Sequence, residues 1–92
     1  MRTELLNIYG IAQRVASIAE GETKKSLAIE IAKLTICLQT NEPVYILYNS
    51  TKKFIYITMS KTETDYEMRE GYKLIIMIER SKELNKYKIT YV

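Results

Sequence analysis

The side chains of this 92-residue chain that could hold a metal or act as a general base are mainly its carboxylates, with one cysteine. There is no histidine, which removes the commonest general base and a frequent metal ligand. Glu63, Asp65, Glu67 and Glu70 lie close together and could bind a hard cation weakly, but they lack the ligand spacing and the glycine of a calcium loop. We therefore expect a solvated acidic segment, with no metal, no cofactor and no catalytic residue.

The single cysteine, Cys37, has apolar neighbours, which favours a buried structural thiol over a nucleophile. One cysteine cannot form an internal disulfide, so we expect a reducing, cytoplasmic location, with an intermolecular bridge as the alternative. The segment 21–26 ends in Lys-Ser like a phosphate loop, but it lacks the second glycine and follows a predicted helix instead of a strand. These features predict a binding protein and not an enzyme.

The first half of the chain has the apolar spacing of two helices. Apolar side chains recur at three- and four-residue steps over residues 2–20, which predicts a helix capped by Thr3 and ended by Gly21. A second helix is predicted from Thr23 to about Gln39. Because the link between them is short, the two helices should form a hairpin.

The second predicted helix has apolar residues on two opposite sides at 100° per residue. An apolar helix of this kind is normally buried on both sides. The second side would meet either the first helix or a second subunit, and the sequence leaves both open. One side consists of Leu27, Ile31, Leu34 and Leu38, and the other of Ile29, Ala32 and Ile36.

After Pro43 the pattern changes to alternation, which predicts strands. The expected strands form two hairpins: Val44 to Asn49 with Phe54 to Met59, and Tyr72 to Glu79 with Lys86 to Val92. We expect residues 60–71 to be a polar loop with about one helical turn. The alternatives are a short helix, with a capping box from Thr64 to Glu67 and its end at Gly71, and a strand extension. The predicted fold is a single α+β domain over residues 1–92, in which a helical hairpin (1–43) packs on a four-stranded, mainly antiparallel sheet, a β-meander (44–92).

Both faces of the predicted sheet are apolar. In a two-layer fold one face of the sheet is polar and exposed to solvent. We therefore expect the second apolar face to be covered by another molecule, and a second copy of this chain is the simplest candidate. The face expected beneath the helices consists of Ile46, Ile55, Ile57, Leu74, Ile76, Ile78 and Ile89. The candidate protein interface consists of Tyr45, Leu47, Phe54, Tyr56, Ile75 and Met77 on the other face, with Ile29 and Ile36 on the second helix.

Nucleic-acid binding is the alternative, because the formal charge of +3 arises entirely in residues 44–92. Against it, the charge is modest and glutamates are interleaved with the lysines. The simpler interpretation is that these lysines protect the sheet edges and keep the protein soluble. The basic residues that would contact phosphates are Lys52, Lys53, Lys73, Arg80, Lys86 and Lys88.

Taken together, the sequence predicts a small regulator or inhibitor that forms a homodimer and binds a protein target. Glu outnumbers Asp ten to one and there are only two Gln, a thermophilic tendency, and an accessory protein of a virus or mobile element would suit the size. The longest apolar run, Leu74 to Ile78, is too short to span a membrane, so no membrane partner is expected.

Overall fold

The computed structural model describes residues 2–19 and 24–92. Within these residues the chain forms an α+β fold with three helices and one five-stranded antiparallel sheet, so the predicted class is confirmed and the predicted strand number is wrong by one. The elements are, in chain order, β1 (Arg2–Leu6), α1 (Ile8–Ile18), α2 (Lys24–Cys37), β2 (Val44–Asn49), β3 (Phe54–Thr58), α3 (Lys61–Arg69), β4 (Lys73–Arg80) and β5 (Tyr87–Tyr91).

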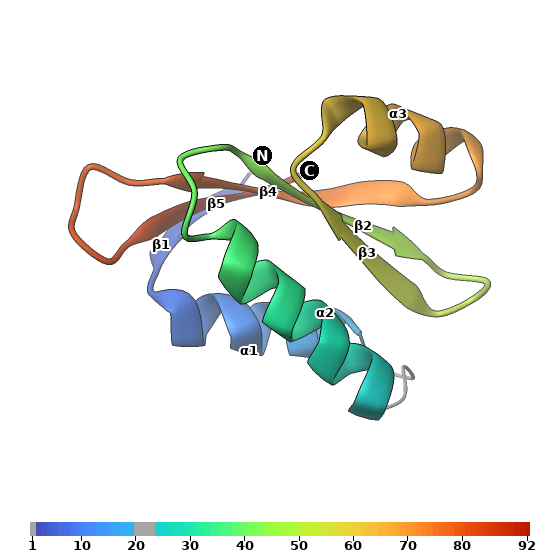
Figure 1. Ribbon diagram of the computed structural model, residues 1–92, viewed down its shortest axis with the longest axis horizontal. Helices are drawn as coiled ribbons and strands as arrows, with labels where there is room; N and C mark the ends of the chain where they lie inside the picture. Colours follow the sequence, from blue (N-terminus) through green and yellow to red (C-terminus); the bar gives the residue numbers. More distant parts are fainter. Residues whose placement is uncertain (1, 20–23) are drawn as a thin grey trace.

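The strands lie in the order β1-β5-β4-β2-β3, with every neighbouring pair antiparallel (Figure 1). The predicted hairpins β2–β3 and β4–β5 are present, each within one residue of its expected bounds. The chain is not a simple meander, because β4 pairs with β2 and α3 crosses from β3 to β4 over the sheet. This crossover leaves β3 at one edge of the sheet, and β1 forms the other edge.

The N-terminal segment differs from the prediction, since Arg2–Leu6 is a strand and not the first turn of a helix. Thr3 pairs with Thr90 in β5 and caps nothing. The cap of α1 is Asn7, whose side-chain oxygen accepts a hydrogen bond from the backbone N–H of Gly10 over 2.9 Å. The predicted end of this helix at Gly21 and the predicted start of the next at Thr23 lie outside the described residues.

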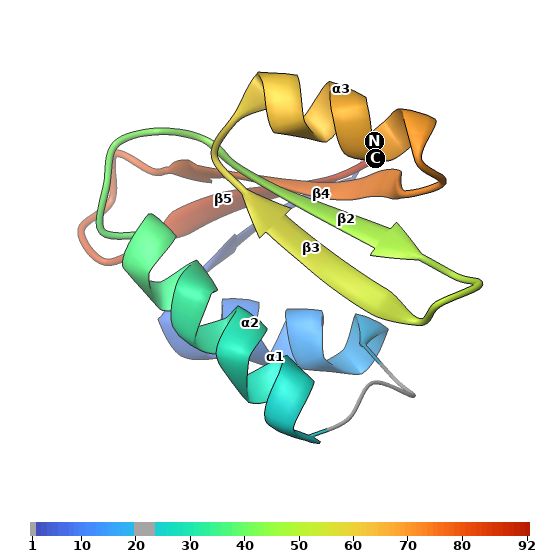
Figure 2. The same cartoon turned by 45° about the vertical axis from the view of Figure 1, so that its right-hand side comes forward.

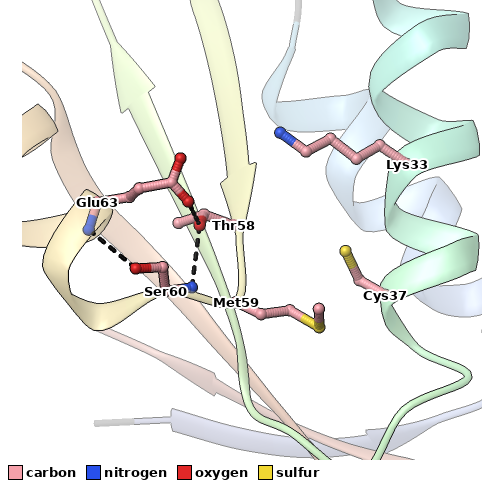
Figure 3. A pocket seen from close by; sticks show the side chains of 6 residues that line it. All are labelled: Lys33, Cys37, Thr58, Met59, Ser60 and Glu63. Carbon is pink, nitrogen blue, oxygen red and sulfur yellow. Dashed lines mark hydrogen bonds between the residues drawn. The ribbon is translucent and has the colours of Figure 1, made fainter.

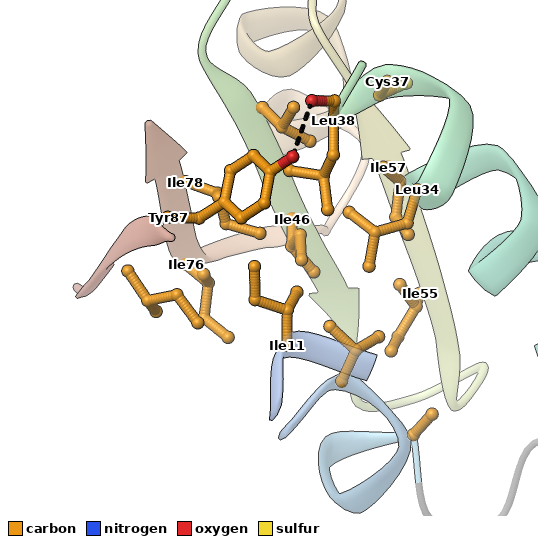
Figure 4. Close-up of a cluster of buried hydrophobic side chains, with 14 residues drawn as sticks. Ile11, Leu34, Cys37, Leu38, Ile46, Ile55, Ile57, Ile76, Ile78 and Tyr87 are labelled. Atoms are coloured by element: carbon orange, nitrogen blue, oxygen red, sulfur yellow. Dashed lines mark hydrogen bonds between the residues drawn. The ribbon is translucent and has the colours of Figure 1, made fainter. Parts of the chain in front are cut away.

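Both α1 and α2 cover one face of the sheet, as predicted for the helical hairpin (Figure 2). Ile11, Leu34, Ile46 and Ile57 meet in the core between these layers and are at most 2% exposed (Figure 4). Burying each such side chain stabilises the fold by about 1.5–3 kcal/mol. The hydroxyl of Tyr87 donates to the carbonyl of Leu38 over 3.2 Å, so the one phenol at the top of this core has a partner.

The third helix, α3, covers part of the opposite face, in the segment where we expected a loop with one turn. Its N-cap is Ser60, whose hydroxyl accepts from the backbone N–H of Glu63, so the helix begins one turn before the start suggested by Thr64. The helix ends at Arg69, two residues before Gly71, which adopts φ of +101°, and the N–H of Tyr72 donates to the carbonyl of Glu67. Under this helix the side chain of Leu47 is completely buried.

A β-bulge in β4 changes which side chains share a face. Ile46 pairs with Ile76 and the next residue, Leu47, pairs with Leu74, so Ile75 has no partner residue in β2. As a result Ile75 packs against the core beneath α1 and α2, while Leu74 lies on the α3 face beside Leu47. The predicted positions of Leu74 and Ile75 on the sheet faces are therefore exchanged.

None of the described helices is long and apolar enough to cross a lipid bilayer.

Candidate protein-interaction site

The outer strand β3 has no charged residue of its own to protect this sheet edge. Its five residues, Phe-Ile-Tyr-Ile-Thr, carry no charge, whereas the opposite edge strand β1 carries Arg2 and Glu4. Charged side chains on an edge strand oppose the addition of another strand. Phe54, at the start of β3, is 45% exposed. Among the described residues no strand pairs with the outer side of β3, so this edge can accept one.

The side of α2 that points away from the core carries exposed apolar residues, together with the exposed Lys25 near its start. Its inner side buries Leu34 and Cys37. At 100° per residue, Ile29, Ala32 and Ile36 fall on the opposite side, and the two isoleucines are 59% and 67% exposed. The predicted two-sided character of this helix is therefore real, and within the described residues α1 leaves the second side open.

A groove runs between the two surfaces, lined by Lys33 and Cys37 from α2, by Thr58, Met59 and Ser60 at the end of β3, and by Glu63 from α3 (Figure 3). We call it the edge groove; its volume is about 440 Å³. Figure 3 shows α2 on one side and the start of α3 on the other, with β3 between them. The edge groove therefore adjoins both the end of the β3 edge and α2.

Glu63 is held by two hydroxyl groups of β3. Its carboxylate accepts from Thr58 Oγ1 over 2.7 Å and from Tyr56 Oη over 2.8 Å. These bonds, first that of Thr58 and then that of Tyr56, together with the charge of Lys33, lower the pKa of Glu63 below its usual value, against the opposing effect of burial. The bond to the carboxylate raises the pKa of Tyr56 to about 12, with a smaller contribution from burial. At neutral pH the pair is therefore an ionised acceptor and a neutral donor.

Lys33 reaches from α2 to the middle of β3, where its Nζ lies 4.8 Å from the centre of the Tyr56 ring. The same ring meets Tyr72 edge to face at 6.0 Å. A cation–π contact of a partly exposed lysine contributes about 0.5–1 kcal/mol. Because this contribution is small and the lysine stem is flexible, Lys33 shields the edge only weakly.

Cys37 lines the groove but is only 7% exposed, and burial raises the pKa of its thiol. The protonated thiol is the inert form, which fits a structural side chain. Of the four clustered acidic residues, Glu63 is occupied by the hydroxyl groups of β3. Across residues 2–19 and 24–92 there is no group of three side chains that could hold a metal ion.

The eight predicted interface residues do not form one open face. Leu47 is buried under α3, Ile75 packs against the core, and Tyr45, Tyr56 and Met77 are half-buried. The exposed members are Phe54, Ile29 and Ile36, which lie on β3 and α2.

The predicted nucleic-acid contacts fall into two groups. Lys52 and Lys53 occupy the β2–β3 turn, and Lys73 begins β4 at the same end of the sheet. Arg80, Lys86 and Lys88 lie around the β4–β5 turn at the other end, where Arg80 Nη1 donates to Asn41 Oδ1 over 3.0 Å. The molecule is 36 Å long, so the six residues do not form a continuous basic track.

Sequence reasoning missed the edge groove because the groove requires α3 to begin beside the end of β3. The available signal was the pattern from Ser60 to Glu63, a capping box at the point where the strand alternation stops. A helix predicted to begin at Ser60 would have placed Glu63 next to Thr58.

Comparison of the chain with protein-family models, with curated proteins and with solved structures found no match in any of the three.

Proposed function

We propose that this chain is a small non-enzymatic binding protein that acts through protein–protein contacts, as a homodimeric regulator or inhibitor. The observation that supports this most is the open outer side of α2, where Ile29 and Ile36 are 59% and 67% exposed beside an uncharged sheet edge. Contiguous apolar surface of this kind is typical of interfaces between proteins.

The groups in the edge groove support a binding role over a catalytic one. Near neutral pH Glu63 is ionised and accepts one hydroxyl bond at each of its oxygens, Tyr56 is neutral, and the Cys37 thiol is protonated. A general acid or base works best when its pKa lies near the working pH, and none of these three meets that condition. The buried thiol also fits the proposed cytoplasmic setting, because reducing conditions preserve it.

Nucleic-acid binding is the second candidate and has weaker support. The basic groups at the two ends of the sheet could each contact phosphates, but a single-strand platform needs a continuous basic groove with aromatic rings along it. Among residues 2–19 and 24–92, Phe54 is the one exposed aromatic residue near Lys52 and Lys53. If this candidate were correct, absorbance at the nucleic-acid wavelength would copurify with the protein and be removed by salt.

The experiment for the first candidate is size-exclusion chromatography with light scattering at micromolar concentration. We expect a dimer for the native chain and a shift towards monomer for Ile29→Glu/Ile36→Glu. The matched control is Tyr66→Glu/Leu84→Glu, which places the same charges at residues 56% and 88% exposed on α3 and in the β4–β5 turn. A native chain that is monomeric throughout this range would refute the homodimer.

A further inference from the structure

We propose that two copies of this chain join through β3, in antiparallel register about a two-fold axis at Tyr56, so that Phe54 of each copy enters the edge groove of the other. This inference depends on the homodimer proposed above and specifies its surface and register. The free edge of β3 and the groove at its end are the observations from which it follows.

The strand itself is complementary to a second copy of itself. Its five residues carry no charge, so self-pairing places no like charges opposite each other. With the axis at Tyr56, Phe54 lies opposite Thr58 of the second copy and every residue of β3 gains a partner. A shift of two residues towards α3 would place Phe54 opposite Ser60, beyond the end of the strand. The register centred on Tyr56 is therefore the one that pairs the full strand.

This register brings an exposed side chain to an open groove. Phe54 and Thr58 lie on the same face of the sheet as α3, because Phe54 pairs with Asn49 and Thr58 with Tyr45 in β2. Directly opposed side chains in an antiparallel pair are about 4.5–5.5 Å apart. Since Thr58 and Met59 line the edge groove, the ring of Phe54 from the second copy meets the groove wall. Each copy supplies one ring and one groove, as a two-fold contact requires.

The α2 helices add to the same contact. A two-fold axis perpendicular to the sheet keeps both α2 helices on one side of the joined sheet, and α2 lies against β3 at the edge groove. The exposed parts of Ile29, Ile36, Phe54 and Met59 amount to roughly 400 Å² of apolar surface per copy, which matches the apolar share of the ~800 Å² that each partner buries in a stable complex. A strand pair without this helix contribution would be much smaller.

Charge favours the arrangement as well. Lys33 lies over the Tyr56 ring and acts on Glu63. Pairing at β3 displaces the lysine head from the ring, and the two-fold axis at Tyr56 places the carboxylate of the second copy near the displaced ammonium. Each Lys33 can then pair with Glu63 of either copy, so its charge stays compensated at the closed edge.

Disulfide trapping tests the register in the full chain, in a Cys37→Ala background. Tyr56→Cys should form a covalent dimer under mild oxidation, because directly opposed Cα atoms in the pair lie within the ~4.4–6.8 Å that a disulfide needs. Phe54→Cys alone should not, since the two copies of that residue lie roughly 14 Å apart. The double variant Phe54→Cys/Thr58→Cys should again form a covalent dimer, because these two residues of different copies lie opposite each other in this register. Trapping of Tyr56→Cys no faster than Phe54→Cys would overturn the register.

A second measurement guards against a folding defect in the cysteine variants. Phe54→Asp should raise the dimer dissociation constant at least tenfold in sedimentation experiments, with an unchanged circular dichroism spectrum, while Leu84→Asp should leave the constant unchanged. An unchanged constant for Phe54→Asp overturns the inference. If the native chain is still a dimer in that case, the homodimer remains and uses another surface; if it is a monomer at all concentrations, both proposals fail.

Discussion

Tyr56 and Glu63 join the edge strand to the helix that crosses over the sheet: the phenol of β3 donates to the carboxylate of α3 over 2.8 Å. The two residues are seven positions apart, and the chain between them makes the turn from strand to helix that the Ser60 cap begins. The pKa values of both groups shift as a consequence, in opposite directions. Two pH-dependent effects on stability follow.

The first concerns acid. Because the pKa of Glu63 is lower in the folded chain than in the unfolded chain, the ionised carboxylate stabilises the fold above about pH 4.5, and this contribution is lost as the pH falls through the folded value. Glu63→Gln should therefore lose less stability than the native chain between about pH 6 and about pH 3. The loss of stability is measured from the urea unfolding midpoints of each protein at the two pH values. Glu83→Gln, in the exposed β4–β5 turn, should behave like the native chain, and an equal loss in all three would contradict the prediction.

The second effect occurs in alkali. The pKa of Tyr56 is raised from 10.0 to about 12, so between these values the unfolded chain releases a proton that the folded chain retains. Stability from this group is complete below about pH 10 and falls as the pH rises towards 12. Tyr56→Phe should be less stable than the native chain at pH 9 and should lose less on going to pH 11. A native curve parallel to that of Tyr56→Phe would show that the phenol bond is absent.

Leu47 is a fully buried apolar side chain of the sheet on the face covered by α3. It is completely buried on a face where the helix contributes mainly polar residues. We expect Leu47→Ala to lower the free energy of unfolding by about 2–5 kcal/mol, and Leu84→Ala, at an 88% exposed site, to change it by less than about 0.5 kcal/mol. Hydrogen exchange should show the largest loss of protection in the amides of α3. Equal loss across α1 and α2 would mean that α3 does not unfold separately.

Asn49 shapes the β2–β3 turn. Its side-chain oxygen accepts from the backbone N–H groups of Thr51 and Lys52, each over 3.0 Å, and the residue is 5% exposed. Removing the acceptor in Asn49→Ala should lower the free energy of unfolding by about 1–2 kcal/mol. Asn49→Asp, which keeps an acceptor oxygen, should recover a measurable part of the loss. Chemical denaturation of the three proteins provides the comparison.

The strands of the second half could be predicted because their signals are local. β2 and β3 alternate over five or six residues and are separated by a polar turn, so their bounds follow from the pattern alone. The bulge at Ile75 gave no such signal, because the continuous apolar run Leu74 to Ile78 is compatible with either face. Which of these side chains lie on which face of the sheet depends on the pairing with β2.

The missing strand and helix have different causes. Arg2–Leu6 is short, and its Leu5 continues the apolar spacing of α1, so a helix pattern and a strand pattern overlap there. It becomes a strand because Tyr87–Tyr91 offers a free edge, which is a contact between the two ends of the sequence. α3 is short and polar, and its position depends on the Ser60 cap and on the bonds from Glu63 to β3.

The pairing of β1 with β5 determines when the fold can be completed during synthesis. β1 is made before the other described strands and its partner β5 after them, so the sheet edge formed by Arg2–Leu6 closes only after Tyr91 has emerged. Until then α1 and α2 can form, but the edge of the growing sheet has no terminal strand. Synthesis of Tyr87–Tyr91, and not any earlier step, allows the hydrogen bonding of Arg2–Leu6 to be completed.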